Sequence, residues 1–448
     1  MSRRQPDTEM ETETPTKLAL ISERARKERR LRFTSLADLL DAGFLKQCYY
    51  KLGRDRASGV DGVTWREYGE HPEENLTALA ARMKAKRYKP LPARRVYIPK
   101  DEHTKRPLGI PALEDKIVQK GIAEILEAIY EADFLDCSYG FRPGRSGHDA
   151  LNAVDKMIMT QPINHVIDAD IKGFFDNVSH KWMMEFLQVR ISDPSFLLLI
   201  RRFLKAGYMG SGMLVATEKG APQGGNLSPM LSNIFLHYVL DLWFDKRVGP
   251  QARGVCHLAR YADDFLCMVQ YADDAQRIRQ ALRERFTKFD LELHPDKTRV
   301  LSFGRCEREN AKRQGRKPHT FDFLGFTHYC GASRRGKFIV GRKTSAKRFR
   351  AKCKAMNEWL KSVRNACKVK EWWPVLRAKL RGHYQYYGVS GNMRSIRRYT
   401  HWTTRLVFKW LNRRSQRRSY NREGFRTYLK HYPLPPSRIV RNLYTLSP

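Results

Sequence analysis

The sequence predicts an α+β body followed by an α-helical domain. Between about residues 17 and 330, segments with helical spacing and segments with strand patterning are mixed without regular βα repetition. From Thr344 onward, the apolar spacing is that of helices joined by loops. The charge changes near the same place, because residues 331–448 carry 31 Lys and Arg but only three acids. We therefore divide the chain into a disordered lead at 1–16, a mixed body at 17–330 and a basic helical region at 331–448.

The body is expected to hold its elements in an irregular order. Residues 17–50 have a helical pattern that is first basic and then apolar, and the glycine-rich stretch at 58–63 is expected to be a loop. A second loop, rich in glycine and arginine, begins at 138 and runs into a helix. The other expected helices lie at 76–83, 113–131, 179–206, 229–247 and 273–289, and the expected strands at 96–100, 163–171, 297–303 and 321–326.

The tetrapeptide Tyr-Ala-Asp-Asp occurs twice, at Tyr261–Asp264 and at Tyr271–Asp274. Apolar, β-forming runs at 255–258 and 265–269 flank the first copy, which predicts a hairpin with the acids at its tip. Two adjacent carboxylates in an apolar hairpin repel each other and lose solvation, and a bound divalent cation removes that penalty. The first copy therefore has the features of the metal-binding aspartate pair of a nucleic-acid polymerase.

The second copy precedes a predicted helix, in which Ile278, Leu282 and Phe286 recur at helical spacing. Asp273 and Asp274 are interpreted there as an N-cap and a first-turn acid, which unpaired amides and the helix dipole favour. We therefore assign the chemistry to the first copy and a structural role to the second.

A further group of acids follows the apolar strand expected at 163–171. In an extended segment, Asp168 and Asp170 lie on one face. Asp170 beside Asp263 would bridge two divalent cations about 3.5–4 Å apart, the arrangement that stabilises the attacking and leaving oxygens in phosphoryl transfer. Asp168 and Asp176 are interpreted instead as loop and cap residues.

Basic and flexible positions complete the expected site. Lys100 and Arg106 stand in a turn between apolar segments and would place positive charge on the transferred phosphates. The two glycines after Gln223 allow a substrate to approach the backbone closely. Lys297 is a candidate proton donor to the leaving pyrophosphate, and a solvated lysine at a strand end is the alternative.

The composition favours a polyanionic partner. Lys and Arg number 84 against 47 Asp and Glu, a net charge of +37, which points to a polyphosphate. In the last quarter of the chain, aromatic residues such as Trp372, Tyr386 and Trp402 are interleaved with the basic ones. A solvated basic face or a disordered tail is the alternative, but the aromatic content favours a folded RNA-binding domain.

The cysteine pattern and the N-terminal sequence indicate the cellular compartment in which the protein is expected. The eight cysteines form no C-x-x-C pair, which disfavours a zinc ribbon or a nuclease domain built on paired cysteines. No apolar stretch approaches the length of a membrane span, and the acids between Asp7 and Glu13 argue against a signal or transit peptide. We therefore expect free thiols, no membrane partner and a cytoplasmic location of bacterial type.

An ordered set of motifs resembles the reverse transcriptases of group II introns, the intron-encoded maturases. In chain order the motifs are V-Y-I-P-K with R-P-L-G-I-P, S-Y-G-F-R-P-G-R-S, D-A-D-I-K-G-F-F-D, A-P-Q-G-G-N-L-S-P, R-Y-A-D-D-F, H-P-D-K-T and F-D-F-L-G-F. In addition, Y-Y-G-V-S-G-N at 386–392 and P-L-P-P at 433–436 resemble that family's thumb and maturase domain. Many relatives also carry an endonuclease with paired cysteines. No such segment is found here, as in the endonuclease-lacking, group IIC-like lineage.

The resemblance implies a right-hand polymerase with fingers, palm and thumb, followed by an α-helical maturase region. Such a protein copies RNA into DNA and binds its intron RNA to assist splicing and mobility. The resemblance implies that Asp170, Asp263 and Asp264 are the catalytic carboxylates and that the Ile171 carbonyl is a further metal ligand. Two Mg²⁺ ions are the expected cofactor, with Mn²⁺ as an alternative.

The resemblance also implies substrate contacts. Lys100 and Arg106 would contact the triphosphate of the incoming dNTP, and Gln223 would line the nucleotide pocket. Phe174 or Phe175 would lie under the sugar, and Tyr261 with Ala262 would form the turn beside the primer. The expected partners are an RNA template, the intron RNA, a DNA primer or target and dNTPs.

Two other functions stay open from the sequence. A splicing factor that binds RNA without polymerising is disfavoured by the intact acids. A domesticated reverse transcriptase in host defence or DNA repair would have the same sequence features as an intron protein.

Overall fold

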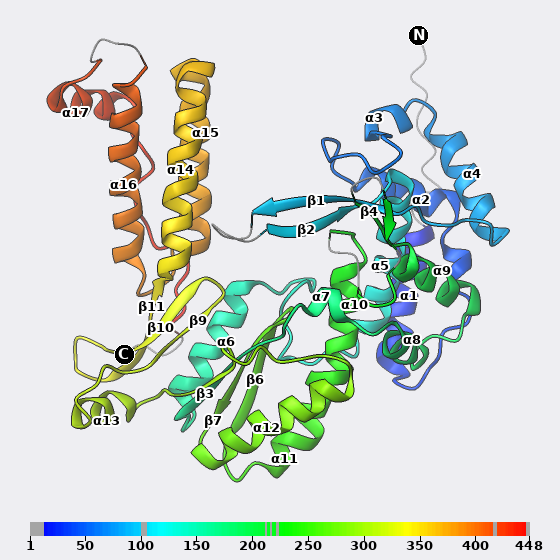
Figure 1. The fold of residues 1–448 in the computed structure, drawn as a ribbon, viewed down its shortest axis with the longest axis horizontal. Coiled ribbons are helices and arrows are strands. Elements are labelled where there is room, and N and C mark those ends of the chain that lie inside the picture. Colours follow the sequence, from blue (N-terminus) through cyan, green and yellow to red (C-terminus); the bar gives the residue numbers. More distant parts are fainter. Residues whose placement is uncertain are drawn as a thin grey trace.

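The computed structural model describes residues 13–99, 105–210, 213–215, 217–220, 224–414 and 419–444. Its centre is a four-stranded antiparallel sheet with the strand order β6-β7-β3-β8 (Figure 1). The strands are β3 (His165–Asp170), β6 (Cys256–Tyr261), β7 (Asp264–Val269) and β8 (Arg299–Ser302). We call these four strands the central sheet.

The two faces of the central sheet belong to two different hydrophobic cores. Side chains alternate along a strand, so neighbouring residues are buried on opposite faces. Ile167, Phe265 and Cys267 pack into a core shared with α12 (Ala272–Lys288) and the N-terminal part of the chain. Val166, Leu266 and Met268 pack into a second core, which is shared with α6 (Gly147–Thr160) and the C-terminal helices.

An N-terminal lobe surrounds α5, whose apolar residues are almost all buried. Lys51, which follows α2, and Arg82 of α4 also form ion pairs with acids of α5. The helices of this lobe are α1 (Glu13–Lys27), η1 (Ala37–Leu39), α2 (Ala42–Tyr50), α3 (Trp65–Tyr68), α4 (Pro72–Lys84), α5 (Leu113–Tyr130), α8 (His180–Gln188) and α9 (Pro194–Lys205). Its sheet has the order β2-β1-β4-β5, from β1 (Ala93–Pro99), β2 (Lys105–Ile110), β4 (Tyr208–Gly210) and β5 (Met213–Val215).

Short elements join the lobe to the central sheet. They are α7 (Phe174–Asn177), α10 (Ser228–Leu236), the π-helical segments η2 (His237–Asp241) and η3 (Phe244–Val248), and α11 (Gly249–Gln251). The helix expected over 229–247 therefore changes from α to π geometry after Leu236. Such π segments are rare and often lie at functional sites.

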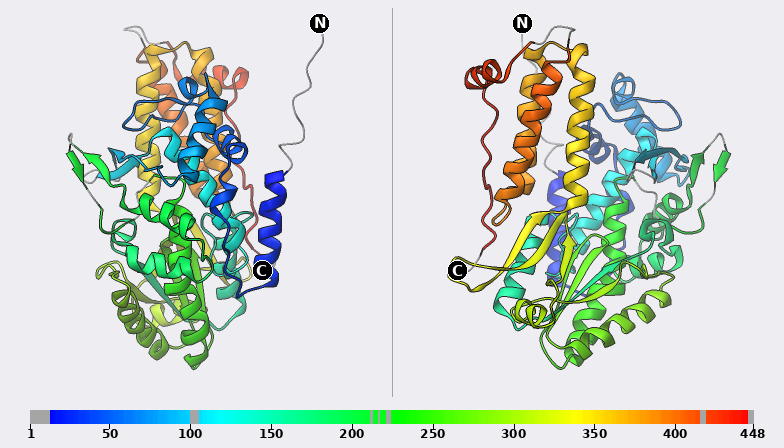
Figure 2. Two further views of the ribbon diagram at one scale, coloured as in Figure 1. Left: turned by 90° about the vertical axis from the view of Figure 1, so that its right-hand side faces the viewer. Right: turned by 60° about the vertical axis from the view of Figure 1, so that its left-hand side comes forward.

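A C-terminal bundle stands on a small sheet (Figures 1 and 2). The small sheet has the order β11-β10-β9, from β9 (Thr320–Phe323), β10 (Phe326–Ala332) and β11 (Phe338–Thr344), and α13 (Glu307–Arg313) precedes it. The bundle consists of α14 (Ala346–Ala366), α15 (Val369–Tyr387) and α16 (Met393–Leu411), with α17 (Arg422–His431) beyond them. The segment after α17 runs back toward the small sheet, where Arg441 forms a bridge with Val389 (Figure 2).

Several boundaries differ from those expected from the sequence. Helix α1 begins at Glu13, inside the predicted disordered lead, whose residues 1–12 lie outside the described chain. The strand expected at 321–326 is two strands, because Leu324 and Gly325 both adopt positive φ and turn the chain. The predicted boundary at residue 330 falls inside β10, which pairs on both sides.

None of the helices in the described ranges combines the length and the apolarity that crossing a lipid bilayer requires.

Candidate active site

Three carboxylates that are far apart in the sequence meet at one end of the central sheet. Asp170 is the last residue of β3 and lies opposite Asp264, the first residue of β7. Asp263 stands with Ala262 in the two-residue turn between β6 and β7, and Ala262 has a positive φ of 58°. The predicted hairpin with acids at its tip is confirmed, and the register brings Asp170 to it.

The carboxylates oppose each other's ionisation. Burial, together with the nearby charges of Asp168, Asp263 and Asp170, raises the pKa of Asp264 to about 7. Burial also raises the pKa of Asp263, and the Asp170 charge adds to this, whereas Arg106 and Arg260 act to lower it. A site of this kind is stabilised by added positive charge.

Two basic side chains supply part of that charge. The Lys297 ammonium lies 2.6 Å from a carboxylate oxygen of Asp170. Arg299 donates a 3.2 Å hydrogen bond to Asp168. Asp168 is therefore a paired strand residue, and its interpretation as a loop or cap residue was wrong because β3 continues through it. Asp176 lies in the first turn of α7.

A buried arginine fixes the turn between β6 and β7. The Arg260 side chain is fully buried, and its guanidinium pairs with the equally buried Asp241 through a 2.7 Å Nε–Oδ1 bond and a second, shorter one. It also donates to the Ala262 carbonyl at 2.9 Å, to Asn233 at 3.0 Å and to Ser138 at 2.8 Å. The Ala262 carbonyl is thus fixed by a cation whose other bonds go to Ser138 and to the continuous helical segment formed by α10 and η2.

The backbone around Arg260 is docked on both sides. Its amide donates to the Cys137 carbonyl at 2.7 Å, and its carbonyl accepts from the Tyr139 amide at 2.9 Å. These bonds attach the loop predicted at 138–151 to β6. The sequence analysis missed Arg260, Asp241 and Asn233, and the only local signal was an arginine inside an apolar strand.

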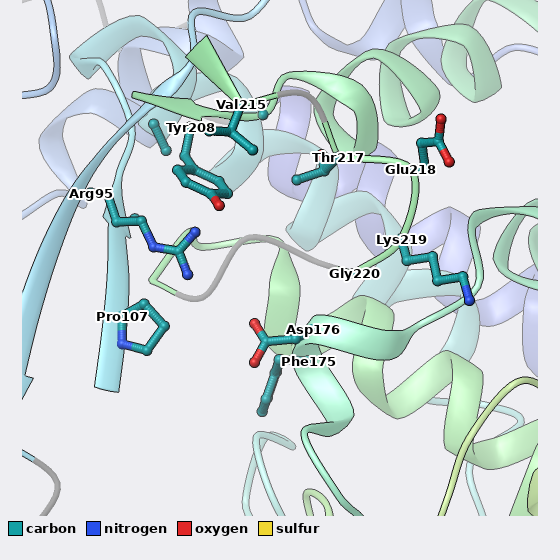
Figure 3. A pocket seen from close by; sticks show the side chains of 13 residues that line it. Arg95, Pro107, Phe175, Asp176, Tyr208, Val215, Thr217, Glu218, Lys219 and Gly220 are labelled. Atoms are coloured by element: carbon teal, nitrogen blue, oxygen red, sulfur yellow. The ribbon is translucent and has the colours of Figure 1, made fainter. Parts of the chain in front are cut away.

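The two phenylalanines after the β3 turn occupy different environments. Phe174 is 2% exposed and packs on Phe235, so it belongs to the core. Phe175 lines a cavity of about 320 Å³, together with Arg95, Asp176 and Tyr208 (Figure 3). On this geometry, only Phe175 of the two predicted candidates is placed to contact a substrate.

Of the predicted substrate contacts Lys100, Arg106 and Gln223, the structure describes only Arg106. The Arg106 guanidinium lies 6.0 Å from the centre of the Phe175 ring and is close enough to Asp263 to act on its pKa. Lys100 and Gln223 lie outside the described residues.

Residues 98–328 match the protein family described as "Reverse transcriptase (RNA-dependent DNA polymerase)". The match covers more than half of the chain and contains every carboxylate of the site. The chain belongs to this reverse transcriptase family.

Known proteins similar to this reverse transcriptase include several from introns. It is 37% identical over 273 residues to Protein YkfC of Escherichia coli (strain K12), covering 54% of this chain and 71% of YkfC. It is 38% identical over 216 residues to the group II intron-encoded protein LtrA of Lactococcus lactis subsp. cremoris, covering 46% of this chain and 36% of LtrA. It is also 40% identical over 177 residues to an uncharacterized 91 kDa protein in the cob intron of Schizosaccharomyces pombe (strain 972), covering 38% of this chain and 22% of that protein. These relatives confirm the predicted resemblance to group II intron proteins, although the matches span only 36% of LtrA and 22% of the cob intron protein.

The donor set of the reverse transcriptase suits a hard divalent cation, since it consists of carboxylate and carbonyl oxygens. Within the described residues, no group of three His, Cys, Asp or Glu side chains is close enough together to bind a metal ion. The Asp170 carboxylate forms an ion pair with Lys297 instead. The Asp170 carbonyl accepts from the His294 amide, and the Lys172 amide donates to Glu292, both at 2.8 Å. Because alternate peptide groups of an extended chain point to opposite sides, the Ile171 carbonyl faces the β7 side, where Asp263 and Asp264 lie.

A groove connects the carboxylates to the C-terminal bundle. Its volume is about 630 Å³, and Asp264 forms one end of it. Basic and aromatic side chains of α14 and α15 line the rest, among them Arg348, Lys352, Lys379 and Tyr386. The Tyr386 hydroxyl donates to the Leu324 carbonyl at 2.9 Å, which ties α15 to the turn before β10.

The second Tyr-Ala-Asp-Asp copy begins α12. Tyr271 is the N-cap residue of α12, so Asp273 and Asp274 both lie in its first turn. The prediction that Asp273 is the N-cap was therefore wrong by two residues, and the first-turn position of Asp274 is confirmed. The buried Asp274 carboxylate accepts from the amides of Arg253 and Gly254 and pairs with Arg277. This copy lies at the opposite end of β7 from the carboxylate site and has a structural role.

Proposed function

We propose that this reverse transcriptase extends a primer on an RNA template with dNTPs, using Asp170, Asp263 and Asp264 as its catalytic carboxylates. The observation that carries the proposal is the register of β3 and β7, which sets Asp170 opposite Asp264. The raised pKa values of Asp263 and Asp264 support it, because a bound cation would stabilise the ionised form of both carboxylates.

Two Mg²⁺ ions, or Mn²⁺ in their place, held by the three carboxylates and the Ile171 carbonyl, would activate the primer 3′-hydroxyl and offset the charge on the leaving pyrophosphate. The residues of the chain position the substrates. As the family resemblance implies, Arg106 with Lys100 would bind the triphosphate, and Gln223 would contact the nucleotide. Phe175, which lines the cavity of about 320 Å³, would lie against the sugar and discriminate against a 2′-hydroxyl.

Lys297 is proposed to supply a proton. Its Nζ lies 2.6 Å from a carboxylate oxygen of Asp170, so it stands beside the proposed metal site. Transfer of one proton from Nζ to the leaving oxygen would neutralise developing charge there.

The three parts of the molecule correspond in this proposal to the parts of a right hand. The N-terminal lobe forms the fingers, the central sheet forms the palm, and the region from 331 forms the thumb and maturase domain. The groove between α14, α15 and Asp264 would hold the template–primer duplex, since its Arg348, Lys352 and Lys379 can neutralise phosphates.

A second surface is proposed for intron RNA. Helix α16 carries exposed arginines at 394, 397, 398 and 405, none of which lines the groove. The exposed Trp402 lies beneath the Arg405 guanidinium, at 5.6 Å, which adds a stacking surface to the charge. RNA bound there would leave the groove free for the duplex.

Primer extension tests the polymerase proposal directly. The purified chain, an RNA template, a DNA primer, dNTPs and Mg²⁺ are expected to give extended product. Asp263→Asn is expected to abolish extension, whereas Asp273→Asn, the same change in the second copy, is expected to retain it. Extension by Asp263→Asn at the wild-type rate would refute the assignment of the carboxylates.

A further inference from the structure

Phe141 is an exposed aromatic residue held in an unfavourable backbone conformation. Its side chain is 53% exposed, and its φ is +56°, in the left-handed region that residues other than glycine rarely adopt. Strained residues persist only when their surroundings fix them, and they cluster at functional sites. An apolar core contact does not explain this residue, since most of its ring faces solvent.

The surroundings fix Phe141 from both sides. On one side, the Gly140 carbonyl accepts from the buried Asn233 side chain at 2.7 Å. On the other, the buried Arg142 guanidinium donates to the Leu135 and Ser138 carbonyls, at 2.7 and 2.9 Å, and pairs with Glu131. The backbone on both sides of Phe141 is therefore fixed, and it determines where the ring is presented.

The loop also presents the ring beside the catalytic turn. A Cβ added at Gly140 would lie 2.4 Å from the Ala262 amide nitrogen, so the two backbones are in direct contact. The ring centres of Phe141 and Tyr261 are 6.5 Å apart, with the planes tilted by 40°. Tyr261 in turn belongs to the hairpin that carries Asp263 and Asp264.

We infer that Phe141 is a stacking platform for a base at the growing end of the template–primer duplex. The inference rests on the proposed function, because it takes the duplex to lie over the hairpin tip. An aromatic ring that is exposed and free of polar atoms accepts the face of any base, so the contact would not depend on sequence. Arg260 and Asn233 serve the same end, since they hold both the turn and the loop that carries the platform.

Stability and substrate binding respond in opposite directions to one substitution, which separates this role from a structural one. Glycine adopts positive φ without strain, so Phe141→Gly is expected to unfold at the wild-type temperature or above it. The same variant is expected to raise KM for the template–primer about 10-fold, the size of effect that loss of one base–aromatic contact produces. Phe141→Trp, which keeps a ring, is expected to retain a KM near the wild-type value.

Tyr271→Ala is the matched control, because Tyr271 is also an exposed aromatic, at 42%, and stands at the far end of β7. It is expected to leave KM unchanged. A single abasic nucleotide, placed at the primer terminus or opposite it in the template, identifies the strand. The ratio of KM between Phe141→Gly and wild type should fall toward one only on the substrate that lacks the contacted base.

The outcomes are distinct from those for the proposed function. If the wild type extends primers and Asp263→Asn does not, the polymerase proposal holds whatever happens at Phe141. An unchanged KM for Phe141→Gly in that setting would overturn the platform. So would a Phe141→Gly protein that unfolds well below wild type, or a KM ratio that neither abasic substrate reduces.

Discussion

The ion pair between Lys297 and Asp170 places a cation on a carboxylate that is also proposed to bind metal. Both side chains are about half exposed, so the pair is solvent-screened and contributes modestly. A metal ion approaching Asp170 must share that carboxylate with the ammonium or displace it. The lysine therefore has two separable effects, on metal binding and on the chemical step.

Lys297→Ala is expected to strengthen Mg²⁺ binding and to slow the chemical step. The half-saturating Mg²⁺ concentration should fall by up to about fivefold, the equivalent of one screened ion pair. The value of kcat should fall by about 100-fold if the ammonium protonates pyrophosphate. Single-nucleotide incorporation across a Mg²⁺ series measures both, with Lys288→Ala, at the exposed end of α12, as control. A normal kcat would assign Lys297 a purely electrostatic role.

Asp115 gives the N-terminal lobe a pH dependence that is independent of metal. Its carboxylate is 2% exposed and accepts hydrogen bonds from the Leu91 amide, at 3.1 Å, and from the Tyr88 hydroxyl. Burial raises its pKa to about 7. Between pH 4 and pH 7 the unfolded chain has therefore lost a proton that the folded chain still binds, so folding stability falls as the pH rises.

Asp115→Asn is expected to remove that slope. Over this window, the free energy of unfolding of the wild type should decrease, relative to the variant, by about 1 kcal/mol per pH unit. Urea unfolding of both proteins at pH 5, 6, 7 and 8 without divalent metal gives the difference directly. Parallel curves for the two proteins would show that Asp115 is ionised in the folded chain throughout this range.

At the scale of single elements, the carboxylate hairpin shows what the sequence could predict. Apolar β-forming runs on both sides of the first Tyr-Ala-Asp-Asp are local signals, and they predicted the hairpin. The strand before Asp170 was predicted in the same way. These predictions succeed because the pattern and the element occupy the same stretch of chain.

The support of the hairpin could not be predicted, because its parts are scattered. Arg260 meets Asp241, Asn233 and Ser138 only through tertiary packing, and Asp241 reaches it from a π-helical segment that no local pattern indicates. Strand β11 was missed for a related reason. Its run F-I-V-G-R-K-T is short and basic, and it becomes a strand by pairing with β10.

Asp241→Asn is expected to lower the free energy of unfolding by about 3–5 kcal/mol, because it leaves the Arg260 charge buried without its partner. The double variant Arg260→Met/Asp241→Leu replaces the pair with apolar side chains and should recover much of that loss. It should not recover primer extension, since the Ala262 carbonyl and Asn233 still lack their donor. Denaturant unfolding and extension rates on the three proteins test this. Recovery of both properties together would make the pair a packing element only.

On the scale of the whole molecule, the central sheet contributes to two hydrophobic cores. One face of the sheet is continuous with the core of the N-terminal lobe, and the other with the core of the bundle. A buried ion pair of 2.6 Å between Arg342 of β11 and Asp155 of α6 adds a polar connection at the base of the bundle. The carboxylates therefore lie between the N-terminal lobe and the C-terminal bundle. A duplex placed over the carboxylates could contact both the lobe and the bundle.

Two basic surfaces on one bundle should give separable salt dependences. Affinity for nucleic acid falls steeply with salt when phosphates are neutralised by Lys and Arg, by a slope of about 0.7 to 0.9 for each contact in a plot of log affinity against log salt. Replacing the four exposed arginines of α16 with Gln should weaken intron RNA binding and make its slope shallower, while extension of a short template–primer is retained. Replacing Arg348, Lys352 and Lys379 of the groove with Gln should weaken binding and extension of the template–primer, while intron RNA binding is retained. Filter binding of a group II intron RNA and of a template–primer, each between 50 and 200 mM salt, distinguishes the two sets. If either set of substitutions weakens both ligands equally, the bundle has one continuous nucleic-acid surface, and intron RNA and duplex would compete for it.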